Sequence, residues 1–215
     1  MTTIQNDPEL IRSWYDKVAA EYALRNFDEL SNKPFDRDIL RRFATLIKGA
    51  GRVYDLGCGP GEVASFLHQC GCDVAGIDLS AEMVKEARRL SPQLSFEQGD
   101  MFALDVPGGS WMGIVAFYAF VHNTPEQLDA LFKEWQRVLA PGGSLLMAFH
   151  VGSEVIQVRE FMGETFTMDF VFFDTDDVVR RIKTAGLVVD EVIIRYPYPK
   201  VEYASKRAYI LARKA

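Results

Sequence analysis

The hydrophobic positions along the chain change their spacing several times, and each spacing predicts a different element. Residues 8–26 and 35–48 place apolar side chains every three to four positions, which is typical of amphipathic helices, and Pro34 separates them. From residue 53 onward, short apolar runs alternate with such helical patterns. This alternation predicts strands over 53–56, 73–79, 94–100, 112–120 and 144–151, and helices over 61–70, 81–90, 125–140 and 174–187.

Alternating strands and helices are typical of an α/β fold in which crossover helices cover a parallel sheet. The end of the chain departs from this pattern, because the predicted strands 188–196 and 205–214 are joined by only a short loop. Strands joined in that way form an antiparallel hairpin, so we expect a mostly parallel sheet with an antiparallel C-terminal strand. Residues 151–173 match neither pattern. They lie between a strand end and the next helix, where open α/β sheets bind ligands, and are expected to form a flap.

Composition and charge exclude several classes of function. The chain has 215 residues, of which 48% are hydrophobic, and this suits one domain with a sizeable core. Its net charge of −6 argues against a nucleic-acid partner, which requires a basic surface. The N-terminus does not resemble a secretory signal, and no apolar run approaches the ~20 residues of a membrane span. We therefore expect a cytoplasmic protein without a membrane partner.

The cysteines and histidines do not form a metal motif. Cys58, Cys70 and Cys72 are odd in number and closely spaced, which favours free thiols in a reducing compartment over a disulfide framework. Their spacing is unlike that of common zinc sites, and no set of histidine partners lies nearby. No metal is expected.

Three glycines at alternate positions, Gly57, Gly59 and Gly61, follow the first predicted strand in the segment DLGCGPGE. A glycine turn between a strand and a helix lets a ligand approach the backbone closely. The dinucleotide fingerprint G-x-G-x-x-G would place its last glycine at position 62, but this chain has Glu62 there. An acid in the first helical turn would repel the pyrophosphate that a helix N-terminus otherwise binds. The turn thus favours a ligand with little negative charge.

Three acids accompany the glycine turn on successive predicted strands: Asp55 before the turn, Asp78 at the end of the second strand, and Asp100 at the end of the third. An acid in the position of Asp78 commonly binds both hydroxyl groups of a ribose. The three acids therefore predict a nucleoside pocket whose ligand carries a cationic group in place of phosphates. S-adenosylmethionine, with its adenine, ribose, sulfonium and amino-acid tail, has this chemistry.

The order and spacing of five segments resemble the class I S-adenosylmethionine-dependent methyltransferases that act on small molecules. The segments are VYDLGCGPGEVA, GIDLS, GDMFAL, FYAFVHNTPEQL and RVLAPGGSLLM, and YDKVAAEYA is similar to the opening helix of that family. The resemblance implies a Rossmann-like three-layer sandwich around a seven-stranded sheet. It also implies a single methyltransferase domain, 1–215, with a helical cap over 1–50, a cofactor-binding core over 51–150, a flap over 151–174, and a C-terminal helix and hairpin over 175–215.

The same resemblance assigns roles to individual residues. Asp78 would bind the ribose, Asp100 would accept from the adenine amino group, and the glycines would let the backbone approach the methionine tail. The cofactor-binding set is Tyr15, Tyr22, Asp55, Gly57, Gly59, Gly61, Asp78, Leu79, Met83, Asp100, Met101, Ala116 and Phe117.

Methyl transfer is an in-line displacement, in which the protein mainly aligns the nucleophile and excludes water. His122 follows the fourth predicted strand and His150 lies at the end of the fifth, both at the ligand edge, so each is a candidate general base. The flap carries Phe161, Phe166, Phe170, Phe172 and Phe173, which favour an apolar or aromatic acceptor. Candidates for contact with polar groups of the acceptor are Arg159, Arg195, Tyr196 and Tyr198.

Other interpretations stay open at this point. The nucleophile of the acceptor is oxygen, nitrogen or carbon, and the protein is a monomer or a homodimer. An NAD-dependent oxidoreductase is a second hypothesis, and it lacks the glycine at position 62. A non-catalytic nucleoside-binding protein on the same scaffold is a third, and retention of Asp55, Asp78 and Asp100 argues against it.

Overall fold

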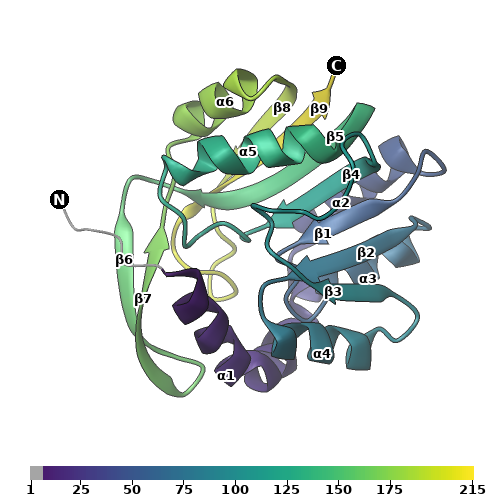
Figure 1. Cartoon of the computed structure of the whole chain (residues 1–215). Helices are drawn as coiled ribbons and strands as arrows, with labels where there is room; N and C mark the ends of the chain where they lie inside the picture. The colour runs from purple at the N-terminus through teal and green to yellow at the C-terminus, as the bar shows by residue number, and fades with distance from the viewer. Residues whose placement is uncertain (1–6) are drawn as a thin grey trace.

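A seven-stranded sheet lies at the centre of the computed structural model, which describes residues 7–215 (Figure 1). Its strand order is β3-β2-β1-β4-β5-β9-β8. The strands are β1 (Val53–Leu56), β2 (Val74–Asp78), β3 (Ser95–Gln98), β4 (Trp111–Phe117), β5 (Leu139–Val151), β8 (Leu187–Arg195) and β9 (Lys206–Lys214). Only β9 runs antiparallel to its neighbours, and it lies between β5 and β8. The predicted mostly parallel sheet with an antiparallel C-terminal strand is confirmed.

Helices cover both faces of the sheet and complete the three layers. One core contains the inner sides of α5 (Gln127–Val138) and α6 (Thr175–Thr184), and the other contains those of α2 (Pro34–Ile47), α3 (Glu62–Gln69) and α4 (Ala81–Leu90). Both cores are continuous with buried side chains of the central strands. This explains the unbroken apolar runs of β4 and β5, which are buried on both faces.

Chain order reverses between β1 and β4, which lie side by side although β2 and β3 separate them in sequence. Open α/β sheets bind ligands beside the carboxyl ends of the strands at such a position. β4 ends at Phe117, three residues before the predicted end of this strand, because Tyr118 adopts a left-handed backbone conformation with φ of 55°. The chain after β4 therefore turns back over the edge of the sheet.

The N-terminal helix α1 (Pro8–Asn26) lies across this edge and is followed by the short 3-10 helix η1 (Glu29–Asn32). Asp7 begins α1 by accepting from the backbone N–H of Glu9, and Pro8 occupies the first turn, where no N–H is needed. None of the helices within residues 7–215 is long and apolar enough to cross a membrane.

Residues 151–173, left without an element by the sequence pattern, contain a separate antiparallel hairpin. It consists of β6 (Val155–Phe161) and β7 (Glu164–Val171), joined at Met162 and Gly163, which both have positive φ. Figure 1 shows this hairpin beside α1, away from the central sheet. Trp14 of α1 stacks on Phe166 of β7 with ring centroids 5.4 Å apart, so the hairpin supports the helix that covers the sheet edge.

Candidate active site

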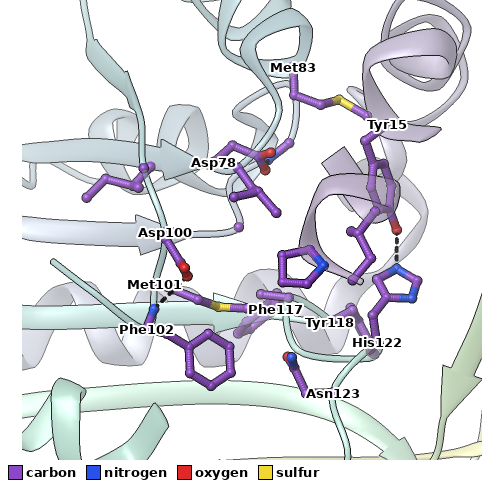
Figure 2. A pocket seen from close by; sticks show the side chains of 18 of the residues that line it. Tyr15, Asp78, Met83, Asp100, Met101, Phe102, Phe117, Tyr118, His122 and Asn123 are labelled. Carbon is purple, nitrogen blue, oxygen red and sulfur yellow. Dashed lines mark hydrogen bonds between the residues drawn. The ribbon is translucent and has the colours of Figure 1, made fainter. Parts of the chain in front are cut away.

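A cavity of about 260 Å³ lies at the carboxyl ends of β1, β2 and β4, beneath α1. Its wall comes from the glycine turn after β1, the end of β2, the turn after β3, the segment after β4 and the inner face of α1. Figure 2 shows Asp78 and Asp100 on one side of the cavity and Tyr15 and His122 on the other. Elements far apart in sequence therefore bring candidate binding and proton-transfer groups to one space.

Most of the side chains and glycines expected at the site line this cavity. They are Tyr15, Tyr22, Gly57, Gly59, Asp78, Leu79, Met83, Asp100, Met101, Phe117 and His122. Four expected residues do not line it: Asp55, Gly61, Ala116 and His150.

Asp78 connects two of the cavity's walls. One carboxylate oxygen accepts from the backbone N–H of Gly59 at 2.8 Å, and the other accepts from that of Ser80 at 2.9 Å. Burial raises the pKa of Asp78 to about 6, although both hydrogen bonds oppose the shift. The carboxylate thus fixes the glycine turn against the start of α4, and its remaining lone pairs are available to a ligand.

Asp100 lies in the turn after β3, where its side chain accepts from the backbone N–H of Phe102 at 2.9 Å (Figure 2). The side chain is exposed, whereas Met101 and Phe102 beside it are half-buried. A flat apolar ring entering here would meet these two side chains, with a carboxylate at its edge.

Glu62, which occupies the position of the missing third glycine, also lines the cavity. Its Oε2 atom is buried and has no hydrogen-bond partner among residues 7–215. Burial raises the pKa of Glu62 well above its ordinary value, and the nearby carboxylates of Glu29 and Asp55 add to the shift. A cationic ligand would stabilise the ionised form of this buried carboxyl, whereas a diphosphate would disfavour that form further.

Tyr15 and His122 form a hydrogen-bonded pair across the cavity from Asp78. The Tyr15 hydroxyl lies 2.8 Å from His122 Nε2, and His122 Nδ1 lies 2.9 Å from the backbone carbonyl of Asp169. A carbonyl oxygen only accepts, so Nδ1 carries the hydrogen and Nε2 accepts from Tyr15. Burial lowers the pKa of His122 to about 4, which keeps the ring neutral near pH 7.

Comparison with known proteins identifies the family of this chain. The profile of a family described as a methyltransferase domain matches residues 53–143. The putative methyltransferase YqeM of Bacillus subtilis is 34% identical over 174 residues, which are 78% of this chain and 67% of that protein. The chain belongs to the class I S-adenosylmethionine-dependent methyltransferases.

Further members of the family differ in length and named substrate. Demethylmenaquinone methyltransferase from Beutenbergia cavernae is 34% identical over 149 residues, which are 67% of this chain and 60% of that protein. The chain therefore spans less than two thirds of this relative. Magnesium protoporphyrin IX methyltransferase from Synechocystis PCC 6803, solved with bound S-adenosylmethionine, has a TM-score of 0.72 at 16% identity over the whole of both chains. This structural likeness shows the fold.

Asp55, Gly61 and Ala116 of this class I methyltransferase support the cavity from outside its wall. Asp55 is buried and accepts from the backbone N–H of Ala64 at 3.1 Å, and burial raises its pKa to about 8. Gly61 has φ of 86°, and a Cβ atom there would lie 2.7 Å from the ring of Phe96. Ala116 is fully buried in the core. These positions give Asp55 and Gly61 a role in holding the glycine turn.

His150 lies in β5, beyond the wall of the cavity. Its Nδ1 atom is 2.7 Å from the Ser205 hydroxyl, and its ring stacks on Phe172. Burial, with a smaller effect from the positive charges of Arg207 and Lys33, lowers the pKa of His150 to about 4. β5 continues to Val151, so His150 remains in the β-ladder with β9, whereas the turn after β4 returns His122 to the cavity.

The side chains expected to contact the acceptor lie outside the cavity wall. Arg195 is bound by Asp36 at 2.8 Å and by both oxygens of Glu202, and its guanidinium also lies over the ring of Tyr198. Tyr196 is 74% exposed. Among the flap phenylalanines, Phe161 and Phe170 pack against Tyr22 and His122 respectively, behind the wall.

Several lining residues were missed by the sequence analysis, including Glu29, Tyr118, Ala119 and Asn123. Tyr118 enters the wall because its backbone is left-handed, a conformation that sequence does not indicate for a tyrosine. Glu29 reaches the cavity from η1, where it pairs with Lys33 at 2.8 Å. Within the described part of the chain, no three His, Cys, Asp or Glu side chains are grouped so as to hold a metal ion.

Proposed function

We propose that this protein binds S-adenosylmethionine in the cavity beneath α1 and transfers its methyl group to a small-molecule acceptor. The observation that carries the proposal is the position of Asp78, which lies on the cavity wall and is hydrogen-bonded to the glycine turn of a class I methyltransferase. Membership of that family and a wall that opposes diphosphates point to the same cofactor.

The residues of the wall fit each part of S-adenosylmethionine. Asp78 would hold the ribose hydroxyls, and Asp100, Met101 and Phe102 would border the adenine. The buried, unpaired Oε2 of Glu62 suits the ammonium group of the amino-acid tail. Leu79, Met83, Phe117 and Tyr22 would supply apolar contacts along the rest of the molecule.

When bound, S-adenosylmethionine supplies an activated methyl group on a cationic sulfur. The protein's part is to hold the acceptor in line with that group and exclude water, which can be worth ~7–11 kcal/mol of the barrier. α1 and the hairpin behind it close the cavity above the sheet edge. Tyr15 and His122 would receive the acceptor's proton, since His122 Nε2 already accepts from the Tyr15 hydroxyl. Proton transfer of this kind typically contributes ~10²–10⁴-fold.

The acceptor is proposed to be a small apolar or aromatic metabolite. The cavity wall contains Tyr15, Tyr22, Phe102, Phe117 and Tyr118, whose rings suit a flat acceptor. Similar proteins are named for substrates as different as demethylmenaquinone, malonyl-acyl-carrier protein and trans-aconitate, so the proposal rests on the wall of this cavity.

Calorimetric titration with S-adenosylmethionine, S-adenosylhomocysteine and NAD tests the proposal. We expect both adenosyl compounds to bind and NAD not to bind. Incubation with methyl-labelled S-adenosylmethionine and a cell extract of low molecular weight should then yield a labelled small molecule. Preferential binding of NAD would support an oxidoreductase. Cofactor binding without transfer to any fraction would support a non-catalytic nucleoside-binding protein.

A further inference from the structure

The cavity wall carries negative groups and no permanent positive charge. Its acidic side chains are Glu29, Glu62, Asp78 and Asp100, and neither lysine nor arginine lines it among residues 7–215. Residues 1–6 contain no charged side chain. Apart from the sulfonium of the bound cofactor, a carboxylate group of an acceptor would therefore meet no counter-ion in the wall.

The nearest cations behind the wall are already neutralised. Lys33, which lies under the ring of Tyr118, pairs with Glu29 at 2.8 Å. Arg195 is held by Asp36 and Glu202, and Arg207 also lies 3.3 Å from Glu202. Removing Arg195 or Arg207 to meet an acceptor's carboxylate would weaken the pairing of the buried carboxylates of Asp36 or Glu202, which is costly, and removing Lys33 would leave the half-buried Glu29 unpaired.

The proton-accepting pair provides a second, independent observation. Tyr15 donates its own hydrogen to His122 Nε2, so the lone pairs of its oxygen are available to accept a hydrogen bond from a ligand. A hydroxyl group is such a donor, whereas a carboxylate has no hydrogen to give. An ammonium group would have to lose its proton before it could attack. A hydroxyl attacks first and becomes strongly acidic as the new bond forms, so a base as weak as His122 suffices.

We propose, building on the function proposed above, that the acceptor presents an un-ionised hydroxyl group on a flat apolar or aromatic skeleton, and that carboxylates are excluded. The acceptor oxygen forms a bond to the methyl carbon as the carbon–sulfur bond breaks and its electron pair returns to sulfur. The acceptor's proton passes to Tyr15 Oη while the proton of Tyr15 passes to His122 Nε2. The products are a methyl ether, S-adenosylhomocysteine and one proton, which His122 later releases to water.

Matched probes on one skeleton test this proposal: 4-ethylphenol, 4-ethylbenzoate and 4-ethylbenzylamine, the last of which is an ammonium ion at pH 7.5. Their binding to the protein loaded with S-adenosylhomocysteine is measured by titration at pH 7.5, so that the result does not depend on finding the natural acceptor. We expect the phenol to bind at least tenfold more tightly than the benzoate and to be the one that gains label from methyl-labelled S-adenosylmethionine. Failure of S-adenosylhomocysteine to bind would contradict the proposed function itself.

Two variants separate recognition of the hydroxyl from general packing. Tyr15→Phe keeps the ring but removes the oxygen, so it should weaken phenol binding at least fivefold and leave benzoate binding unchanged. Tyr196→Phe changes an exposed tyrosine outside the cavity and should alter neither. The proposal would be overturned if the benzoate bound as tightly as the phenol or more tightly, or if Tyr15→Phe weakened the binding of both probes equally. Absence of phenol binding at millimolar concentration would also overturn it.

Discussion

At the scale of single residues, Asp78 has a position that makes its role directly testable. A ribose bound by its carboxylate gains charge-assisted hydrogen bonds, and such bonds are typically worth ~1.5–3 kcal/mol. We expect Asp78→Asn to weaken binding of S-adenosylmethionine at least tenfold in a titration at pH 7.5. Because the pKa of Asp78 is raised to about 6, affinity of the wild type should fall as pH drops below 6, when the carboxylate becomes protonated.

The exposed Asp105 supplies the control, since Asp105→Asn makes the same chemical change away from the cavity. In Asp78→Asn the dependence of affinity on pH near 6 should be lost. A folded Asp78→Asn variant with unchanged affinity would remove Asp78 from the site.

The pair of Tyr15 and His122 gives a second prediction at this scale. His122→Gln and Tyr15→Phe should each lower methyl transfer at saturating cofactor by ~10²-fold or more, because the acceptor's proton then lacks its receiving group. The affinity for S-adenosylhomocysteine should change little. In the wild type this rate should fall only as pH approaches 4, where His122 gains a proton, and not near the ordinary histidine value of 6.5. Loss of cofactor affinity without loss of transfer would mean that the pair serves binding alone.

Sequence spacing was sufficient to predict the site residues that stand at the carboxyl ends of parallel strands. Asp78 ends β2 and Asp100 follows β3, and the carboxyl ends of parallel strands meet at one edge of the sheet. It was insufficient for His122 and His150, which it placed at the ends of neighbouring strands, at the same edge of the sheet. The left-handed Tyr118 ends β4 and turns His122 inward, whereas pairing with β9 keeps His150 in β5. Sequence does not show that difference.

At the scale of elements, the contact between α1 and α4 determines how the cavity is covered. Asp16 of α1 accepts from the Ser80 hydroxyl at 2.6 Å and from the backbone N–H of Glu82 at 3.2 Å, and Ser80 itself caps α4. Asp16 thus acts as a helix cap supplied by another helix. A lost cap typically costs ~1 kcal/mol, so we expect Asp16→Ala to speed dissociation of S-adenosylhomocysteine about fivefold.

Stopped-flow displacement followed by tryptophan fluorescence measures this rate, because Trp14 lies on the same helix. Glu21→Gln is the matched control on α1: Glu21 pairs with Arg25, at 2.5 Å, and its side chain is 39% exposed. Equal rates in the wild type and Asp16→Ala would show that α1 is held by its apolar contacts alone.

The β6–β7 hairpin is the element that the sequence pattern did not resolve. Its strands pair with each other and not with the central sheet, so they lack the continuous apolar run of β4 or β5. The available sequence signal was the pair Met162-Gly163 between two alternating segments. In the structure both residues have positive φ, which suits the turn of a tight hairpin. The place of the hairpin against α1 depends on ring contacts such as Trp14 with Phe166, which have no local signature.

At the scale of the whole molecule, the buried carboxyl of Asp55 links stability to pH. Its pKa is about 8 in the folded protein, against an ordinary value of 3.8, because burial disfavours the charged form. Between these values the folded state holds a proton that the unfolded state releases. The free energy of unfolding should therefore fall as pH rises from about 4 to about 8, by at most about 1.4 kcal/mol per pH unit from this residue.

Asp55→Asn isolates the effect, since an amide oxygen can still accept from the backbone N–H of Ala64 and the side chain no longer ionises. Urea unfolding at pH 5, 6, 7 and 8 should give a flatter dependence on pH than in the wild type, with the variant gaining relative stability toward pH 8. The other titrating groups, Asp78 among them, are common to both proteins and cancel in the difference. Parallel curves for the two proteins would mean that Asp55 is ionised in the folded state, and a buried negative charge would then lie behind the glycine turn, outside the cavity wall.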